Sequence, residues 1–141
     1  MAAVARYIAD TSALARQHRP EIHTVLRPLI ERGLVATCAI IEFEVLWSTR
    51  TAAEFEEVHG DRAVAYEWLP IEDVDWRRAL DVLAQLWASG KARSVPLPDL
   101  LIAAVAERHQ VTVIHYDADY DLIAAMTNQP TQWVVPAGTV P

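Results

Sequence analysis

The sequence predicts an α/β protein of three layers, α/β/α, with helices on both faces of a short, mainly parallel central sheet. Short apolar runs of strand length alternate along the chain with segments of helical spacing. This alternation is typical of parallel sheets that are covered on both faces. The chain has 141 residues, of which 52% are hydrophobic. This is enough for one core, so a single domain over residues 1–141 is expected.

The first fifty residues predict two strands that alternate with three helices. The strands are short apolar runs, and Ser12 is a suitable cap for the brief helix after the first of them. The second helix has apolar residues every three or four positions, with Gly33 as its stop signal. The expected elements are strands at 4–9 and 34–37 and helices at 12–17, 21–32 and 39–48.

The rest of the chain continues the alternation. Its clearest helix repeats large apolar residues every three or four positions, and we expect this stripe to lie in the core, with a dimer interface as the alternative. The stripe consists of Trp76, Leu80, Leu83 and Trp87. Pro98 suits the first turn of a later helix. The expected elements are helices at 51–68, 72–89, 98–109 and 120–126, and strands at 68–71, 112–115 and 133–135.

The composition excludes several classes of protein. A single cysteine, Cys38, permits neither an internal disulfide nor a thiolate metal cluster. The five histidines show no HExxH motif and no paired zinc spacing. No apolar run reaches the roughly 20 residues of a membrane helix, and the N-terminus lacks the apolar region of a signal peptide. We therefore expect a soluble cytoplasmic protein without a membrane segment.

Four carboxylates follow predicted strands, begin a helix or lie inside an apolar helix. Asp10 directly follows the first strand, and Asp117 follows the fourth by two residues. Asp99 lies in the first turn of the helix before that fourth strand, and Glu44 lies within the apolar segment AIIEFEVLW. Sites in open parallel sheets form outside the carboxyl ends of the strands. We therefore expect the four acids to meet at one edge of the sheet.

Four carboxylates at one edge would repel one another, so they would take up protons or bind cations. Ligands that are all oxygen atoms suit Mg²⁺ or Mn²⁺, which also bind phosphate oxygens. Such ions can activate a water molecule and stabilise the leaving oxygen in phosphodiester cleavage. The acids therefore favour a metal-dependent enzyme that acts on phosphate esters.

Two stretches, ADTSAL around Asp10 and DLLIAAVAERHQVTVIHYDADYDLI from Asp99 onward, carry a resemblance to a known family. Together with the order of the elements, they resemble the PIN-domain nucleases, and among these the small VapC-type toxins of toxin–antitoxin pairs. The resemblance implies a PIN-like domain and a metal-dependent endoribonuclease toxin that cleaves structured RNA, often transfer RNA, by phosphodiester hydrolysis. It also implies a homodimer and a cognate VapB-like antitoxin that blocks the site.

Carried over by position, the resemblance implies an acidic catalytic site with Mg²⁺ or Mn²⁺ as cofactor. The catalytic acids would be Asp10, Glu44, Asp99 and Asp117, and the metal ligands among them Asp10, Asp99 and Asp117. The supporting residues would be Thr11, Ser12 and Asp119. One departure from the family pattern is His115, which stands where the family often has threonine.

Several alternatives stay open. Glu42 competes with Glu44 for the second acidic position, and the number of metal ions is one or two. An aspartate after the first strand also serves as the nucleophile of phosphatase-type enzymes that transfer phosphoryl groups. Those enzymes have a second aspartate two residues on, where this chain has Ser12. A catalytically inactive PIN fold that only binds proteins is the remaining alternative, which the full set of acids disfavours.

The net charge of −7, from 19 acidic and 12 basic residues, argues against a broad nucleic-acid-binding face. A groove-shaped site depends more on its local field than on net charge, and bound cations would reverse part of that field. Basic residues near the predicted acids are candidates for binding RNA phosphates. They are Arg16, Arg19, Lys91 and Arg93, for which ordinary surface charge is the alternative.

Overall fold

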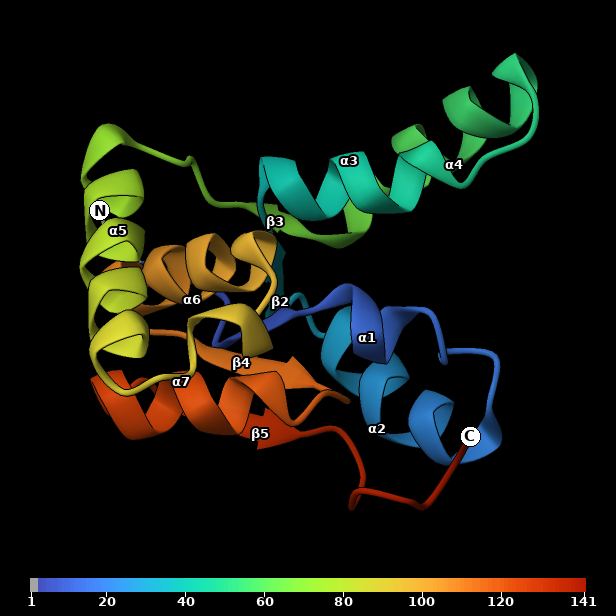
Figure 1. Ribbon diagram of the computed structural model, residues 1–141. Helices are drawn as coiled ribbons and strands as arrows, with labels where there is room; N and C mark the ends of the chain where they lie inside the picture. Colours follow the sequence, from blue (N-terminus) through green and yellow to red (C-terminus); the bar gives the residue numbers. More distant parts are fainter. Residues whose placement is uncertain (1–2) are drawn as a thin grey trace.

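The computed structural model describes residues 3–141, and its centre is a sheet of five parallel strands (Figure 1). The strands are β1 (Tyr7–Ala9), β2 (Val35–Thr37), β3 (Glu67–Trp68), β4 (Thr112–His115) and β5 (Thr131–Trp133). Their order is β3-β2-β1-β4-β5, so β1 is the central strand. Tyr7 in β1 pairs with Val35 on one side and with Thr112 on the other. The carboxyl ends of all five strands therefore lie at one edge.

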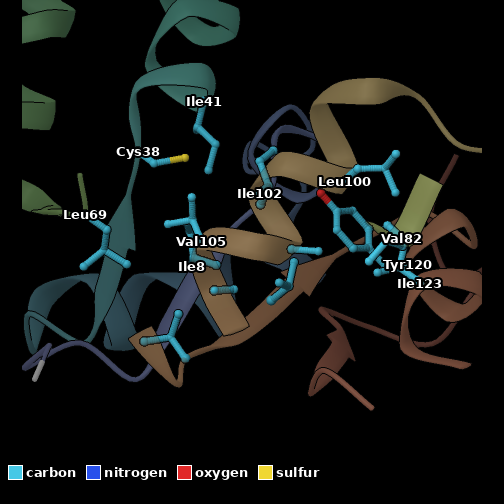
Figure 2. Packing of buried hydrophobic residues seen from close by; sticks show 14 of the residues in the cluster. Ile8, Cys38, Ile41, Leu69, Val82, Leu100, Ile102, Val105, Tyr120 and Ile123 are labelled. Atoms are coloured by element: carbon cyan, nitrogen blue, oxygen red, sulfur yellow. The ribbon is translucent and has the colours of Figure 1, made fainter. Parts of the chain in front are cut away.

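Helices cover both faces of this sheet. The helices are α1 (Thr11–Leu14), α2 (Pro20–Glu31), α3 (Ala39–Trp47), α4 (Ala52–Ala65), α5 (Asp73–Ala88), α6 (Leu97–His109) and α7 (Asp119–Thr127), with a 3₁₀ turn η1 at Ala92–Ser94. On one face, Ile8 and Val113 pack with side chains of α5, α6 and α7, as Figure 2 shows for Ile8, Val82, Ile102 and Ile123. On the other, Ile114 packs with α1 and α2. The predicted three-layer α/β/α fold is confirmed.

The helix α6 is the most deeply buried element. All its residues from Asp99 to Ala106 are buried, which explains why the sequence shows no polar stripe along it. Gln110 ends the helix in the left-handed conformation. Because α6 lies against both the sheet and α5, the acid in its first turn is held by the core.

The helices α3 and α4 form an arm that projects beyond the sheet (Figure 1). The surface of the arm carries several exposed apolar residues, since Phe43, Trp47 and Val64 are all largely exposed and Trp47 is 90% exposed. A buried ion pair between Arg62 of α4 and Glu42 of α3 ties the two helices together at 2.8 Å. This pair fixes the arm to the body, because the hydroxyl of Thr37 in β2 also donates to Glu42.

The structure corrects several predicted details. The expected core stripe on α5 is wrong for three of its four residues, because Trp76, Leu80 and Trp87 are each more than half exposed, whereas Leu83 packs against the core as expected. Val82 and Leu86 form the buried face of α5 instead. The helix has apolar residues on two flanks, and its periodicity alone does not decide which flank faces the core.

The remaining corrections concern boundaries. The first strand begins at Tyr7, and the last strand spans Thr131–Trp133 instead of 133–135. The first helix ends at Leu14, and its N-cap is Asp10 instead of Ser12. Among the described residues, no helix combines the length and the apolar character that a membrane crossing requires.

Candidate active site

Asp10 lies where the central strand turns into α1. Its backbone N–H donates to the carbonyl of Ile114 in β4 at 2.9 Å, which holds the turn against the neighbouring strand. Its side chain is almost fully buried and accepts two hydrogen bonds. The Oδ2 atom accepts from the N–H of Ser12 at 3.0 Å, and the Oδ1 atom accepts from the hydroxyl of Tyr120 at 2.9 Å. Asp10 is therefore both a helix cap and an acid with a fixed orientation.

Asp99 is the acid whose ionisation is most disturbed. It lies in the first turn of α6 and is only 8% exposed. Burial and the negative charges of four acidic neighbours raise its pKa from 3.8 to about 8. These neighbours are Asp10, Asp117, Asp119 and Glu44. The other three predicted catalytic acids, Asp10, Glu44 and Asp117, therefore all lie close enough to Asp99 to affect its ionisation.

Three carboxylates are close enough to share one cation. Oxygen atoms of Asp99, Asp117 and Asp119 all lie within 4.8 Å of one another. The backbone N–H of Asp119 donates to Oδ1 of Asp117 at 2.9 Å, so a tight turn after β4 presents both side chains. Burial and the charge of Asp117 raise the pKa of Asp119. The structure thus groups Asp119 with Asp99 and Asp117, although the family resemblance implied only a supporting role for it.

Glu44 approaches the acids from the arm. The hydroxyl of Thr11 donates to its Oε2 atom at 3.2 Å, and burial together with the charge of Asp10 raises its pKa. Glu42 faces a different environment. Although burial opposes it, hydrogen bonds from Arg62 and Thr37 hold the pKa of Glu42 below its usual value. Of the two glutamates, Glu44 therefore lies at the acidic site beside Thr11 and Asp10, and Glu42 forms the ion pair of the arm.

Ser12 connects the two turns that carry the acids. Its hydroxyl accepts a hydrogen bond from the N–H of Tyr116 at 2.9 Å, and Tyr116 directly precedes Asp117. Thr11 connects the same turn to Glu44, as described above. The two hydroxyl groups of the Asp-Thr-Ser motif therefore hold the β1 turn to β4 on one side and to the arm on the other.

Two buried aromatic residues lie behind the acids, and sequence reasoning gave neither of them a role in the site, although it noted His115 as a departure from the family pattern. His115 and Tyr120 are fully buried, and their rings stack at a centroid distance of 4.9 Å. The Nδ1 atom of His115 accepts from the N–H of Asp117 at 3.2 Å, and burial lowers the pKa of the imidazole. The only signal in the sequence is the position of these residues on either side of the Asp117 turn.

Residues 7–126 match the family described as PIN domain. The chain belongs to the PIN-domain family. Ribonuclease VapC21 of Mycobacterium tuberculosis is 44% identical to this PIN domain over 134 residues, which cover 95% of this chain and 97% of the relative. That similarity confirms the predicted VapC-type group.

Two solved structures share the fold of this PIN domain. One is described as DNA-bound VapBC from Salmonella typhimurium and matches with a TM-score of 0.76 at 14% identity, covering 94% of this chain and 100% of that one. The other is described as VapBC-5 of Mycobacterium tuberculosis, a member of the VapBC family of toxin–antitoxin systems. It matches with a TM-score of 0.59 at 25% identity and covers 90% of this chain and 96% of that one.

The acidic cluster of this PIN domain has the chemistry of a site for a hard cation. Its donors are all carboxylate oxygens, which suit Mg²⁺ or Mn²⁺ better than softer metals. Within residues 3–141, every ion pair of an arginine or lysine is made with an acid outside the cluster. The negative charge that raises the pKa of Asp99 is therefore not neutralised by the protein itself.

The four basic residues predicted to bind RNA lie in different environments. The guanidinium group of Arg16 donates to carbonyls of Ser12 and Pro141 and lies 4.8 Å from the ring centre of Tyr116. Arg93 lies over the ring of Trp87, and Lys91 is exposed. Arg16 is therefore already held beside the turn that carries Asp10. The fourth candidate, Arg19, is the N-cap residue of α2.

Proposed function

We propose that this PIN domain is a VapC-type endoribonuclease toxin that hydrolyses phosphodiester bonds with the help of Mg²⁺ or Mn²⁺. The observation that carries this proposal is the cluster of Asp99, Asp117 and Asp119, with the pKa of Asp99 raised to about 8. A buried carboxylate among uncompensated negative charges costs stability, and a divalent cation removes that cost. The ribonuclease name of the VapC21 relative supports the same activity.

The metal ligands in this proposal are Asp10, Asp99 and Asp117, joined by Asp119. When bound, a divalent cation would supply Lewis acidity to a phosphate oxygen and a more acidic water. Of the acids in the site, Glu44 is the most exposed, and it is suited to accept a proton from the attacking water. Thr11 holds Glu44 for that role, and Tyr120 and Ser12 hold Asp10.

The proposed substrate is structured RNA, in particular transfer RNA. RNA is recognised largely through its shape and through unstacked loops, so a broad basic face is not required. Arg16 lies beside the Asp10 turn and is partly exposed, a suitable position for a phosphate contact. Because few cations contribute, RNA affinity is expected to be modest and to decrease with salt.

The proposed partner is a VapB-like antitoxin. A hollow of about 650 Å³ lies between the arm and the helices α1 and α2, and it borders Glu44 and Thr11 of the acidic site. Its walls combine apolar side chains with the acids Glu44 and Asp61. A segment with apolar and basic residues fits this hollow, and an arginine from it would pair with the acids. The description of VapBC-5 as part of a toxin–antitoxin system supports such a partner.

The final part of the proposal is a homodimer. The exposed residues Trp76, Leu80 and Trp87 lie along one flank of α5. Exposed apolar patches of this kind mark interaction surfaces in proteins that are otherwise polar outside. We assign this flank to a second copy of the chain. In a dimer with two-fold symmetry, the apolar residues of the flank would be covered by the same residues of the partner.

The test is the variant Asp99→Asn in a cleavage assay with labelled transfer RNA and Mg²⁺. We expect activity to fall by more than about 100-fold. Loss of a residue that only supports a metal ligand typically lowers metal affinity or activity by no more than about that factor. Without metal, the variant should unfold at the same temperature as the wild type or higher, because a buried repulsive carboxylate is gone. Asp81→Asn, at an exposed position of α5, is the matched control and should keep full activity.

Chelation of divalent ions should abolish cleavage by the wild type, and adding purified antitoxin to the assay should have the same effect. An Asp99→Asn variant as active as the wild type would contradict the proposed site. A wild type that neither binds Mg²⁺ in calorimetry nor cleaves RNA would favour the inactive protein-binding alternative.

A further inference from the structure

Tyr120 makes a contact that the packing of the core does not require. Its ring is fully buried against Leu100, Val82 and Ile123, where a phenylalanine would fill the same space (Figure 2). Its hydroxyl donates to Oδ1 of Asp10 at 2.9 Å, across 110 residues of sequence. A buried hydroxyl is costly unless it forms a hydrogen bond, and bonds to a carboxylate are among the strongest.

The ring that carries this hydroxyl has little freedom to move. Tyr120 stacks on His115 at a centroid distance of 4.9 Å, and His115 lies 5.1 Å from the ring centre of Trp133. His115 in turn accepts a hydrogen bond from the N–H of Asp117. The stacked rings therefore connect the position of the Tyr120 hydroxyl to the turn that carries another acid of the site.

Each carboxylate oxygen of Asp10 is thereby assigned one fixed donor. The Tyr120 hydroxyl bonds Oδ1, and the N–H of Ser12 bonds Oδ2. Because the two donors come from different elements, they fix both the position and the plane of the carboxylate. A carboxylate has about four acceptor positions, so capacity remains for a cation.

We propose that Tyr120 is a positioning residue that orients the Asp10 carboxylate toward the divalent cation of the acidic cluster. The inference rests on the proposed function, since it assumes that the cluster binds Mg²⁺ during cleavage. Donors behind metal ligands commonly set metal affinity, and their loss lowers it roughly 10- to 100-fold.

The experiment is a Mg²⁺ titration of RNA cleavage by Tyr120→Phe, at a saturating concentration of RNA. We expect the Mg²⁺ concentration for half-maximal rate to rise by roughly 10- to 100-fold, with the KM for RNA unchanged at high Mg²⁺. A purely structural role would lower the maximal rate through a smaller folded fraction and leave this midpoint unchanged. Calorimetric titration of Mg²⁺ without RNA should show the same shift in affinity.

Tyr116→Phe is the matched control. Its hydroxyl also forms several hydrogen bonds, but these join the backbone of Gly138 and Val140, and none joins an acid. This control should leave the Mg²⁺ midpoint unchanged. An unchanged midpoint in Tyr120→Phe, or an equal shift in Tyr116→Phe, would overturn the inference while the proposed function stands. A wild type whose cleavage does not depend on Mg²⁺ would overturn the proposed function and this inference with it.

Discussion

At the scale of single residues, Glu42 and Glu44 show how environment separates two identical side chains. Both lie in α3, two positions apart, yet Glu42 faces the buried guanidinium of Arg62 and Glu44 faces Thr11 and the acids. The consequences for ionisation are opposite, because the pKa of Glu42 is lowered and that of Glu44 is raised. Glu42 thus stabilises the fold through its ion pair, and Glu44 is the candidate for proton transfer in the proposed reaction.

This difference predicts that Glu42→Gln and Glu44→Gln have opposite phenotypes. Glu42→Gln leaves Arg62 buried without a charged partner and should reduce the free energy of unfolding by about 3 kcal/mol or more. Glu44→Gln should lower RNA cleavage by roughly 100-fold or more, as loss of a proton-transfer group does, with little effect on stability. Urea unfolding and the cleavage assay measure the two effects. A loss of cleavage confined to Glu42→Gln would reverse the assignment.

At the scale of elements, the exposed flank of α5 predicts self-association. Leu80→Glu places a charge in the middle of the flank and should convert a dimer into a monomer, as measured by light scattering during gel filtration. The free energy of unfolding of each protomer should change little, because Leu80 is 63% exposed. Gln85→Glu, at another exposed position of the same helix, is the control. A wild type that is monomeric at all concentrations would contradict the homodimer.

The elements also show what sequence could and could not predict. The acids were predictable because Asp10 and Asp117 follow apolar strands, and parallel strands end at one edge of the sheet. The exposure of the α5 flank was only an alternative at the level of sequence, since two apolar flanks satisfy the same periodicity and the core was the favoured place for this one. Tyr120 was not predictable, because its partner lies 110 residues away and the local pattern matches an ordinary core tyrosine. Residue spacing within one element can be read from the local sequence, whereas contacts between elements that are distant in sequence cannot.

At the scale of the whole molecule, buried ion pairs make stability depend on pH. Asp75 is the clearest case, since Arg108 donates to both of its oxygens. Although burial opposes it, the hydrogen bonds from Arg108 and from the N–H of Glu72 lower the pKa of Asp75 below 3.8. An acid with a lowered pKa stabilises the fold above its unfolded pKa and loses that contribution as the pH falls through its folded pKa.

The wild type should therefore lose stability steadily as the pH drops below about 4, near the unfolded pKa of aspartate. Asp75→Asn should be less stable than the wild type at pH 7, and the difference between them should shrink as the pH falls. Thermal unfolding between pH 3 and pH 7 measures both trends. Asp73→Asn, in an exposed pair with Arg77, should follow the wild type. A constant difference between wild type and Asp75→Asn over this range would exclude the linkage.

The order of the strands also has a consequence for the synthesis of the chain. The central strand β1 is synthesised before its neighbour β4 and the Asp117 turn, and two strands and most of the helices lie between them in the sequence. A growing polypeptide on the ribosome therefore carries Asp10 and Glu44 long before it carries the residues that complete the cluster. The proposed acidic site can therefore form only after β4 and the Asp117 turn have been synthesised and have paired with β1.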